Sequence, residues 1–294
     1  MAEGERYEVG ERPPGRFTAL IYADPGLGKT HLISTTPVDT LVLQHDLSGA
    51  ETLEKTALRD AIRARGVHCW VEDVLTDREA LGHVLKAKSE VELAIRNGQP
   101  LPYQMIVLDG LCALEDSIQS ELVATGGPYV QTNRPEMLSQ GGWGALGMRH
   151  LRVRRAALSI PRVHVIFTAL ERTRGDDATS AHYVDAALGG QQGRRYKADV
   201  SYVLHLEVAN TPTGVKTYLA FERSAGTVTK ARRDDLLGKG RIPADLGLLM
   251  QRLGYIGPDG KGVAGGDAGT APPAAFAQGE GPPPGIPLAF GPKA

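Results

Sequence analysis

Short apolar segments alternate with longer polar stretches along most of the chain. The apolar segments predict five strands, at residues 17–22, 40–44, 68–74, 104–109 and 163–170. Short runs that are apolar throughout are typical of strands buried on both faces, as in a parallel sheet covered by helices. Helical patterns lie between them, notably an amphipathic run at residues 77–97. We therefore expect an α/β fold with a mostly parallel sheet and helices on both faces.

The pattern changes after residue 199, where strand-like segments follow one another without helices. Segments 199–208 and 216–223 flank a turn at residues 210–214, and a further strand is predicted at 227–231. Consecutive strands of this kind are typical of antiparallel pairing, which places an antiparallel edge near the C-terminus. A short helix at residues 243–253 is expected to close the fold.

Composition separates a folded domain from its two ends. Residues 1–16 are polar and include Pro13 and Pro14, which predicts a flexible N-terminal arm. Residues 257–294 are rich in Gly, Pro and Ala and carry few charges, which predicts a disordered tail. The remaining residues 17–256 have the length of one α/β domain.

Charge and cysteine content narrow the function classes. The chain carries 34 acidic and 33 basic residues, so net charge argues neither for nor against nucleic acid. Cys69 and Cys112 show no zinc-ligand spacing with histidines. The charged N-terminus is unlike a signal peptide, and no run of 18 apolar residues occurs, so we expect a cytoplasmic protein without membrane contact.

A phosphate-binding loop follows the first predicted strand and leads into a helix at residues 29–36. Its sequence matches the P-loop pattern G-x-x-x-x-G-K-[ST], except that Ala23 stands at the first position. Gly26 and Gly28 allow backbone N–H groups to turn toward phosphate oxygens, Lys29 would reach the β- and γ-phosphates, and the Thr30 hydroxyl would bind Mg²⁺. The predicted ligands of ATP are Asp24, Pro25, Gly26, Leu27, Gly28, Lys29, Thr30 and His31.

Acidic residues at the ends of later strands supply the other chemistry of such a site. Asp109 ends the fourth predicted strand, where a carboxylate would hold Mg²⁺ together with Thr30. The next residue is Gly110, whereas hexameric AAA+ motors usually place a water-activating Glu there. We expect Asp46 to orient the attacking water, with Glu51 and Glu115 as alternatives, although the Asp46 segment is also favourable for a simple turn.

In this order, the segments resemble the RecA-like branch of P-loop ATPases. They are more closely similar to the phage nucleotide-binding proteins that include the Sak-type single-strand annealing ATPases. The resemblance extends over residues 16–253 and is carried by segments 23–30, 41–49, 105–109, 163–170, 187–206 and 229–232. It implies a RecA-like ATPase that acts on single-stranded DNA in recombination or annealing, in the bacterial host cytoplasm if a phage encodes it. It also implies a homo-oligomer, ring or filament, with nucleotide between subunits.

The resemblance implies roles for individual residues. Asp46 would activate water, and a polar residue after the metal-binding acid would sense the γ-phosphate, for which Thr168 is the candidate. Lys230 and Arg232 match a K-x-R pair that reaches the nucleotide of the neighbouring subunit. Trp143 is expected to be a core anchor, with base stacking as the alternative.

Two loops, at residues 125–142 and 171–197, would bind DNA according to the same resemblance. The second contains Tyr183 and Tyr196, which could stack on bases. The alternative is an ordinary solvated loop. The basic residues expected to contact DNA phosphates are Arg172, Arg174, Arg194, Arg195 and Lys197.

Three functions remain open at this stage. The first is the DNA-dependent ATPase. The second is a kinase of a nucleotide or small molecule, in which the arginines of 171–197 would belong to a lid. The third is a nucleotide-switched assembly protein with little turnover. An apolar segment in the tail, residues 285–290, is also a candidate docking peptide for a single-strand binding protein.

Overall fold

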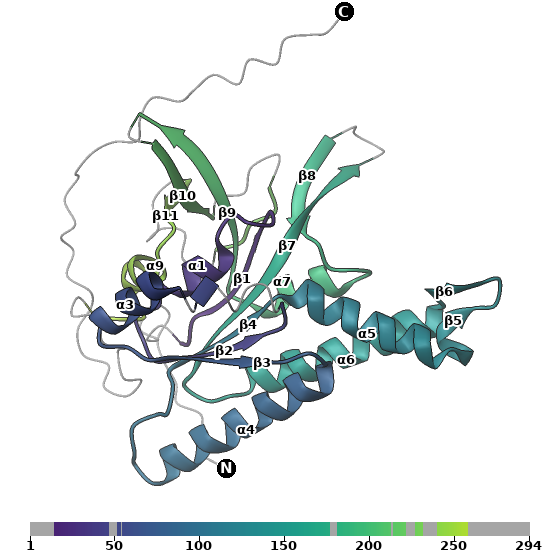
Figure 1. Ribbon diagram of the computed structural model, residues 1–294, viewed down its shortest axis with the longest axis horizontal. Helices are drawn as coiled ribbons and strands as arrows, with labels where there is room; N and C mark the ends of the chain where they lie inside the picture. Colours follow the sequence, from purple (N-terminus) through teal and green to yellow (C-terminus); the bar gives the residue numbers. More distant parts are fainter. Residues whose placement is uncertain are drawn as a thin grey trace, which may run out of the picture.

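A mixed sheet forms the centre of the molecule. The computed structural model describes residues 15–46, 52–53, 55–176, 181–212, 214–221, 227–231 and 240–257. The predicted arm and tail therefore lie almost wholly outside the described residues. Within them the sheet has the order β11-β10-β9-β1-β7-β4-β2-β3, with β8 paired to β7 beside this path (Figure 1).

The strands from β9 to β3 in this order are parallel, and β10 and β11 add an antiparallel edge. This confirms the predicted fold class, an α/β core with a mostly parallel sheet and an antiparallel edge near the C-terminus. The strands are β1 (Thr18–Ala23), β2 (Thr40–Gln44), β3 (Cys69–Asp73), β4 (Met105–Asp109), β7 (His164–Asp176), β8 (Ala181–Ala186), β9 (Tyr202–Thr211), β10 (Gly214–Ala220) and β11 (Arg241–Pro243).

Helices cover both faces of the sheet, as predicted. One face packs against α4 (Asp77–Arg96), α5 (Leu111–Thr125), α6 (Gln140–Leu158) and α7 (Gln192–Asp199), and the other against α1 (Lys29–Ile33) and α9 (Leu246–Arg252). A further helix, α3 (Thr56–Ala64), lies between β2 and β3 in the chain. Along β1, Leu20 and Tyr22 enter the first core and Ala19 and Ile21 the second, because successive side chains of a strand point to opposite faces.

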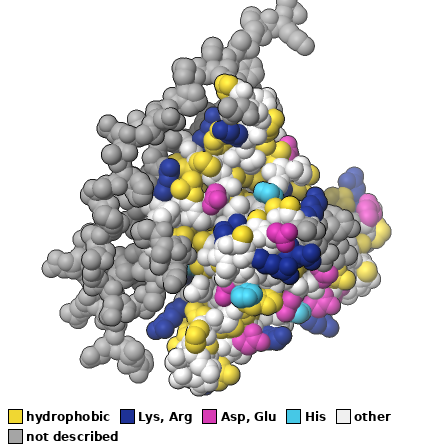
Figure 2. Space-filling view, turned by 60° about the vertical axis from the view of Figure 1, so that its left-hand side comes forward, with side chains coloured by type: hydrophobic (Ala, Val, Ile, Leu, Met, Phe, Trp, Pro, Cys, Tyr) yellow, Lys and Arg dark blue, Asp and Glu magenta, His cyan; other side chains and the backbone are white. Residues whose placement is uncertain are grey.

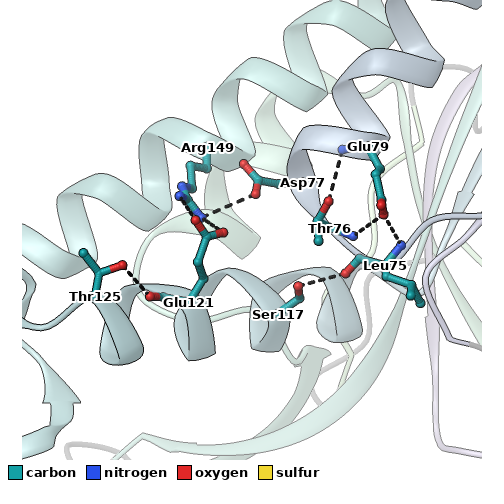
Figure 3. Close-up of polar contacts among 8 residues, drawn as sticks. All are labelled: Leu75, Thr76, Asp77, Glu79, Ser117, Glu121, Thr125 and Arg149. Atoms are coloured by element: carbon teal, nitrogen blue, oxygen red, sulfur yellow. Dashed lines mark hydrogen bonds and ion pairs between the residues drawn. The ribbon is translucent and has the colours of Figure 1, made fainter.

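Three of the helices on the first face are joined at Arg149 of α6. Its guanidinium donates to both carboxylate oxygens of Glu121 on α5, at 2.7 and 2.8 Å, and to Asp77 at the start of α4, at 3.4 Å (Figure 3). These contacts lower the pKa of the Glu121 carboxyl. Thr76 and Glu79 form a capping box that begins α4 at the same place. The contacts of Arg149 hold α4, α5 and α6 together on the face of the sheet that they cover.

Both predicted DNA-binding loops have regular structure, so the expectation of irregular loops is wrong. Segment 125–142 holds a single turn of 3-10 helix (Gly127–Tyr129) and a hairpin of β5 (Val130–Gln131) and β6 (Arg134–Leu138). This hairpin stands at the far end of α5 (Figure 1). In the described part of segment 171–197, residues 171–176 belong to β7, residues 181–186 form the antiparallel strand β8, residues 187–191 form a short loop and residues 192–197 belong to α7. The β7–β8 and β9–β10 hairpins extend beyond the sheet in the same direction (Figure 1).

The C-terminal part also differs from expectation in detail. Residues 227–231 form two isolated bridges, from Thr227 to Val184 and from Lys230 to Val203, in place of a strand. The edge strand is instead β11, whose last residue, Pro243, had been expected to begin the last helix. Among the residues that the structure describes, no helix combines the length and the apolar character needed to cross a bilayer.

Candidate functional site

The P-loop leaves the carboxyl end of β1 and begins α1. Gly26 has φ 78° and Gly28 has φ 92°, a left-handed conformation that glycine adopts without strain. Asp24, Pro25 and Gly26 are exposed, so the loop opens to solvent. Ala23 is fully buried and pairs in register with Leu170, which makes the first motif position the last residue of the strand. The small side chain therefore fits the strand end and leaves the glycine turn unchanged.

Lys29 folds back over the loop that it follows. Its ammonium donates to the carbonyl oxygens of Ala23 and Asp24, each at 2.9 Å. Burial lowers the pKa of Lys29, and the nearby Asp109 carboxylate opposes this effect. A phosphate group at the loop would offer the ammonium a charged acceptor in place of these neutral carbonyls.

Asp109 stands at the centre of a hydrogen-bonded chain that links the strands β4 and β7 to the first helix. Its Oδ2 accepts from the Thr30 hydroxyl at 3.0 Å, and its Oδ1 accepts from the Thr168 hydroxyl. Thr168 in turn accepts from the Gly110 backbone N–H at 2.9 Å. Asp109 and Thr168 are almost fully buried, with exposures of 3% and 1%. The structure thus brings Thr30, Asp109 and the candidate sensor Thr168 together.

These residues fit the magnesium ion of a P-loop site. A hydroxyl and a carboxylate, already within hydrogen-bond distance of each other, are the hard oxygen ligands that Mg²⁺ prefers. In the described part of the chain no group of three or more His, Cys, Asp or Glu side chains could hold a metal. Two protein ligands are the usual complement here, because nucleotide phosphates and water supply the others. The ion would neutralise phosphate charge.

Asp46 lies directly against Gly110 at the carboxyl ends of β2 and β4. A Cβ at Gly110 would stand 3.2 Å from the Asp46 backbone nitrogen, and Gly110 has φ 93°. The position after Asp109 therefore has neither the space nor the backbone conformation for a Glu, which explains the departure noted in the sequence. Asp46 is exposed and its carbonyl accepts from Gln44 at 2.8 Å. Its part in catalysis stays a prediction.

Of the alternatives to Asp46, Glu115 faces another part of the molecule. Its carboxylate accepts from the Gly189 N–H at 2.7 Å and lies 3.6 Å from His150. Burial raises the pKa of Glu115 to about 6 and lowers that of His150 to about 4. Glu51 lies outside the described residues.

The sequence reasoning missed a pair beside the P-loop strand. Glu171 on β7 and His205 on β9 meet at 2.7 Å across the end of β1, and the ring of Tyr22 stacks on that of His205. Burial lowers the pKa of Lys29, and the Glu171 carboxylate, like that of Asp109, opposes this lowering. The available signal was the position of Glu171, directly after the fifth predicted strand, where the carboxyl ends of parallel strands meet.

The K-x-R pair is only partly described. The Lys230 ammonium donates to three carbonyls at the end of α7, those of Lys197, Ala198 and Val200, at 2.9, 3.3 and 2.6 Å. A lysine at this place stabilises the negative end of the helix. In the single chain Lys230 therefore binds within its own subunit, and its predicted contact with the nucleotide of a neighbour stays a prediction. Arg232 lies outside the described residues.

The predicted DNA-binding residues divide into two groups. Arg172 donates to the Leu188 carbonyl, and Lys197 donates to both carboxylate oxygens of Asp185 at 2.8 Å. Tyr196 is fully buried, so the expectation that it stacks on bases is wrong. Arg194 and Arg195 of α7 are exposed, as a contact with DNA would require. Arg174 belongs to β7, and its side chain lies outside the described structure.

Comparison with known proteins agrees with the geometry of the P-loop. A family model described as an AAA domain matches residues 16–233. No curated protein matches the sequence significantly.

Similar solved structures include two archaeal proteins and one bacterial ATPase. The KaiC-like protein PH0186 of Pyrococcus horikoshii OT3 is 12% identical, with 71% of this chain and 79% of that one covered and a TM-score of 0.37. The flagellar accessory protein FlaH of Methanocaldococcus jannaschii is 11% identical, with 72% and 80% covered and a TM-score of 0.36. The assembled ATPase EscN of the enteropathogenic E. coli type III secretion system is 16% identical, with 65% and 43% covered and a TM-score of 0.40.

Proposed function

The chain belongs to the AAA domain family of P-loop ATPases, and on that premise we propose that it hydrolyses ATP with Mg²⁺ and couples this reaction to single-stranded DNA. The observation that carries the proposal is the position of Thr168. It contacts Asp109 and Gly110 in the nucleotide site and belongs to the strand that continues into the β7–β8 hairpin. A displacement of the Asp109 carboxylate would therefore be passed by Thr168 along β7 to the hairpin.

The P-loop and the acidic residues beside it would have separate roles in ATP hydrolysis. Gly26 and Gly28 hold backbone N–H groups toward the phosphates, and Lys29 adds a positive charge. Thr30 and Asp109 would hold the metal ion, which neutralises charge on the phosphates. Asp46, at the mouth of the site beside Gly110, would orient the attacking water.

The DNA part of the proposal is supported by the exposed charges of α7. Arg194 and Arg195 are exposed and lie just beyond β8, which pairs with β7. Over the face shown in Figure 2, acidic and basic side chains are interspersed. Binding of a polyanion would thus depend on local groups of arginines, as the balanced net charge also requires.

The test is the rate of ATP hydrolysis with and without single-stranded oligonucleotide, at several salt concentrations. We expect Mg²⁺-dependent turnover that DNA stimulates and that high salt returns to the basal rate, because phosphate contacts weaken as salt rises. Lys29→Ala should remove turnover with and without DNA. The double variant Arg194→Gln/Arg195→Gln should lose stimulation, whereas Arg96→Gln, at the exposed end of α4, should keep it.

Other results would point to the other functions. Transfer of phosphate to a nucleoside monophosphate would indicate a kinase and refute the proposal. Slow turnover that is indifferent to DNA would indicate an assembly protein whose state depends on the bound nucleotide. A homo-oligomer with nucleotide between subunits is part of the proposal. Light scattering with and without ATP would detect it, and an unchanged monomer would exclude it.

A further inference from the structure

An exposed tryptophan lies beside the free arginines of α7. Trp143, in the first turn of α6, is 42% exposed, so it is not the core anchor expected from its sequence. Its ring rests on the loop before α7, where a Cβ on Gly189 would stand 3.1 Å from the ring and a Cβ on Gly190 would stand 3.9 Å from it. The glycine pair therefore gives the indole a flat support and leaves its outer part open to solvent.

Arg195 shares this surface with Trp143. A Cβ on Gly147 would lie 3.4 Å from a terminal nitrogen of Arg195. Gly147 is four residues after Trp143 on α6, so both positions face α7. Arg194 and Arg195 are exposed, and neither forms an ion pair with any residue that the structure describes. The surface thus presents an aromatic ring close to the unneutralised Arg195, and the exposed Arg194 is the preceding residue of α7.

Three other cations in this region are already neutralised within the fold. Arg149 pairs with Glu121, Arg154 pairs with Asp199 at 2.7 Å, and Lys197 pairs with Asp185. Arg194 and Arg195 differ from them in having no such partner among the described residues. Unpaired arginines next to an exposed indole fit a ligand that has both flat rings and negative charge.

We propose that Trp143 stacks on a base of single-stranded DNA while Arg194 and Arg195 neutralise the adjoining phosphates. The inference rests on the proposed function and names the surface at which its DNA partner binds. Base stacking on an aromatic ring and phosphate contacts from arginine are the two elements of strand binding without sequence preference. Duplex DNA would bind more weakly, because its bases are already stacked and paired.

The same surface is connected to the nucleotide site through α5. Gly189, under the indole, donates its N–H to Glu115 at 2.7 Å. A Cβ on Gly189 would come within 2.4 Å of that carboxylate, so the contact excludes any larger residue. Glu115 lies on α5, which begins at Gly110, beside Asp109. A strand held on Trp143 therefore presses on a loop that is hydrogen-bonded to the helix behind the metal-binding acid.

Intrinsic fluorescence gives a direct test, because the chain has only 2 tryptophans. Trp70 is 44% exposed on the edge strand β3 and is not part of this surface. In the Trp70→Phe protein, addition of oligo-dT should quench the emission of Trp143. In the Trp143→Phe protein, the emission of Trp70 should stay unchanged while DNA binds.

Affinity measured by fluorescence anisotropy of a labelled oligonucleotide completes the test. Trp143→Ala should bind about 5- to 150-fold more weakly, which corresponds to the loss of one stacked base. Trp143→Phe should recover part of the affinity, and the matched control Trp70→Ala should bind as the unmodified protein. Each of Arg194→Gln and Arg195→Gln should lower the slope of log K against log salt by about 0.7.

The outcomes separate this inference from the proposed function. If DNA stimulates ATP hydrolysis but Trp143→Ala binds it normally and Trp143 emission is unaffected, the stacking surface is refuted and the proposed function stands. If the unmodified protein neither binds DNA nor responds to it, both fail. If Trp143→Ala changes self-association and leaves DNA affinity intact, the surface serves contact between copies of the chain, and the inference is overturned.

Discussion

The Thr168 hydroxyl offers the sharpest test of the hydrogen-bonded chain behind the P-loop. Thr168→Val keeps the shape of the side chain and removes its hydroxyl. The change leaves one Asp109 oxygen without its donor and the Gly110 N–H without its acceptor. Each such buried group costs about 1–3 kcal/mol when unsatisfied. Burial of the added methyl group returns about 1 kcal/mol.

The net loss in the free energy of unfolding is therefore about 2–4 kcal/mol, with the two effects treated as parts of one network. In a domain of this size each kcal/mol lowers Tm by roughly 2–4 °C, so Tm should fall by roughly 5–15 °C. Equilibrium urea unfolding at 25 °C gives the free energy directly, and the ATPase rate should fall in parallel because Asp109 loses its orientation.

Thr229→Val is the matched control. The Thr229 hydroxyl is also buried, but it has no hydrogen-bond partner among the described residues. Its removal should therefore change stability by less than about 0.5 kcal/mol or increase it. If Thr168→Val costs no more than this control, the chain from Thr30 to Gly110 contributes nothing to stability and the reasoning is refuted.

Three further predictions concern other parts of the fold. Gly142→Ala should destabilise the protein by about 1–3 kcal/mol, because the new Cβ would lie 2.1 Å from the Tyr129 carbonyl oxygen. Gly144→Ala in the same helix meets nothing within 4 Å and should stabilise the protein by up to about 1 kcal/mol. Thermal unfolding of the two variants tests this, and equal Tm values would contradict it. Burial raises the pKa of Glu115 from 4.5 to about 6, so the folded state binds the proton more tightly than the unfolded state. The stability of the unmodified protein relative to Glu115→Gln should therefore fall by about 2 kcal/mol in total as pH rises from below the unfolded pKa to above the folded one, roughly from pH 3.5 to 7. A pH-independent difference would exclude this effect. Lys230→Ala should lower the free energy of unfolding by about 1–2 kcal/mol at any protein concentration, because the C-terminal end of α7 loses its cation. A loss of stability seen only in oligomers would instead support a contact with the neighbouring subunit.

The buried part of the fold was largely predictable because its strands carry a continuous apolar signal. The second predicted strand, residues 40–44, has the same bounds in the structure, and the amphipathic run at 77–97 corresponds to α4. Such elements enter the core along their whole length, so their sequence records their burial. The P-loop was predictable for another reason, since its two glycines are required by positive φ angles.

The polar hairpins could not be predicted in this way. The upper half of β7 continues as Glu-Arg-Thr-Arg-Gly-Asp, which has no apolar face, because the hairpin stands above the sheet. Its structure comes from backbone pairing with β8, which a hydrophobic pattern does not record. The β5–β6 hairpin was missed for the same reason, since four of the five residues of β6 are exposed.

The candidate site was predicted in its residue types but less well in their partners. Thr30, Asp109 and Thr168 do meet, because the carboxyl ends of neighbouring parallel strands share one edge. Tyr196 was expected to stack on bases, yet it lies in the core, and the hydrogen bonds of Lys230 to the end of α7 were not foreseen. Sequence shows that a side chain is basic or aromatic, but the packing of a helix against the sheet decides where it points.

The length of β7 could carry a movement from the nucleotide site to the end of the β7–β8 hairpin. The strand has 13 residues, and Thr168 lies near its base while Asp176 ends it. At about 3.3 Å per residue, the stretch between them measures roughly 26 Å. A rigid lever of this length that tilts by about 5° moves its tip by about 2 Å. A small displacement of the Asp109 carboxylate, passed on by Thr168, would thus become a movement as large as an atomic diameter at the end of the hairpin.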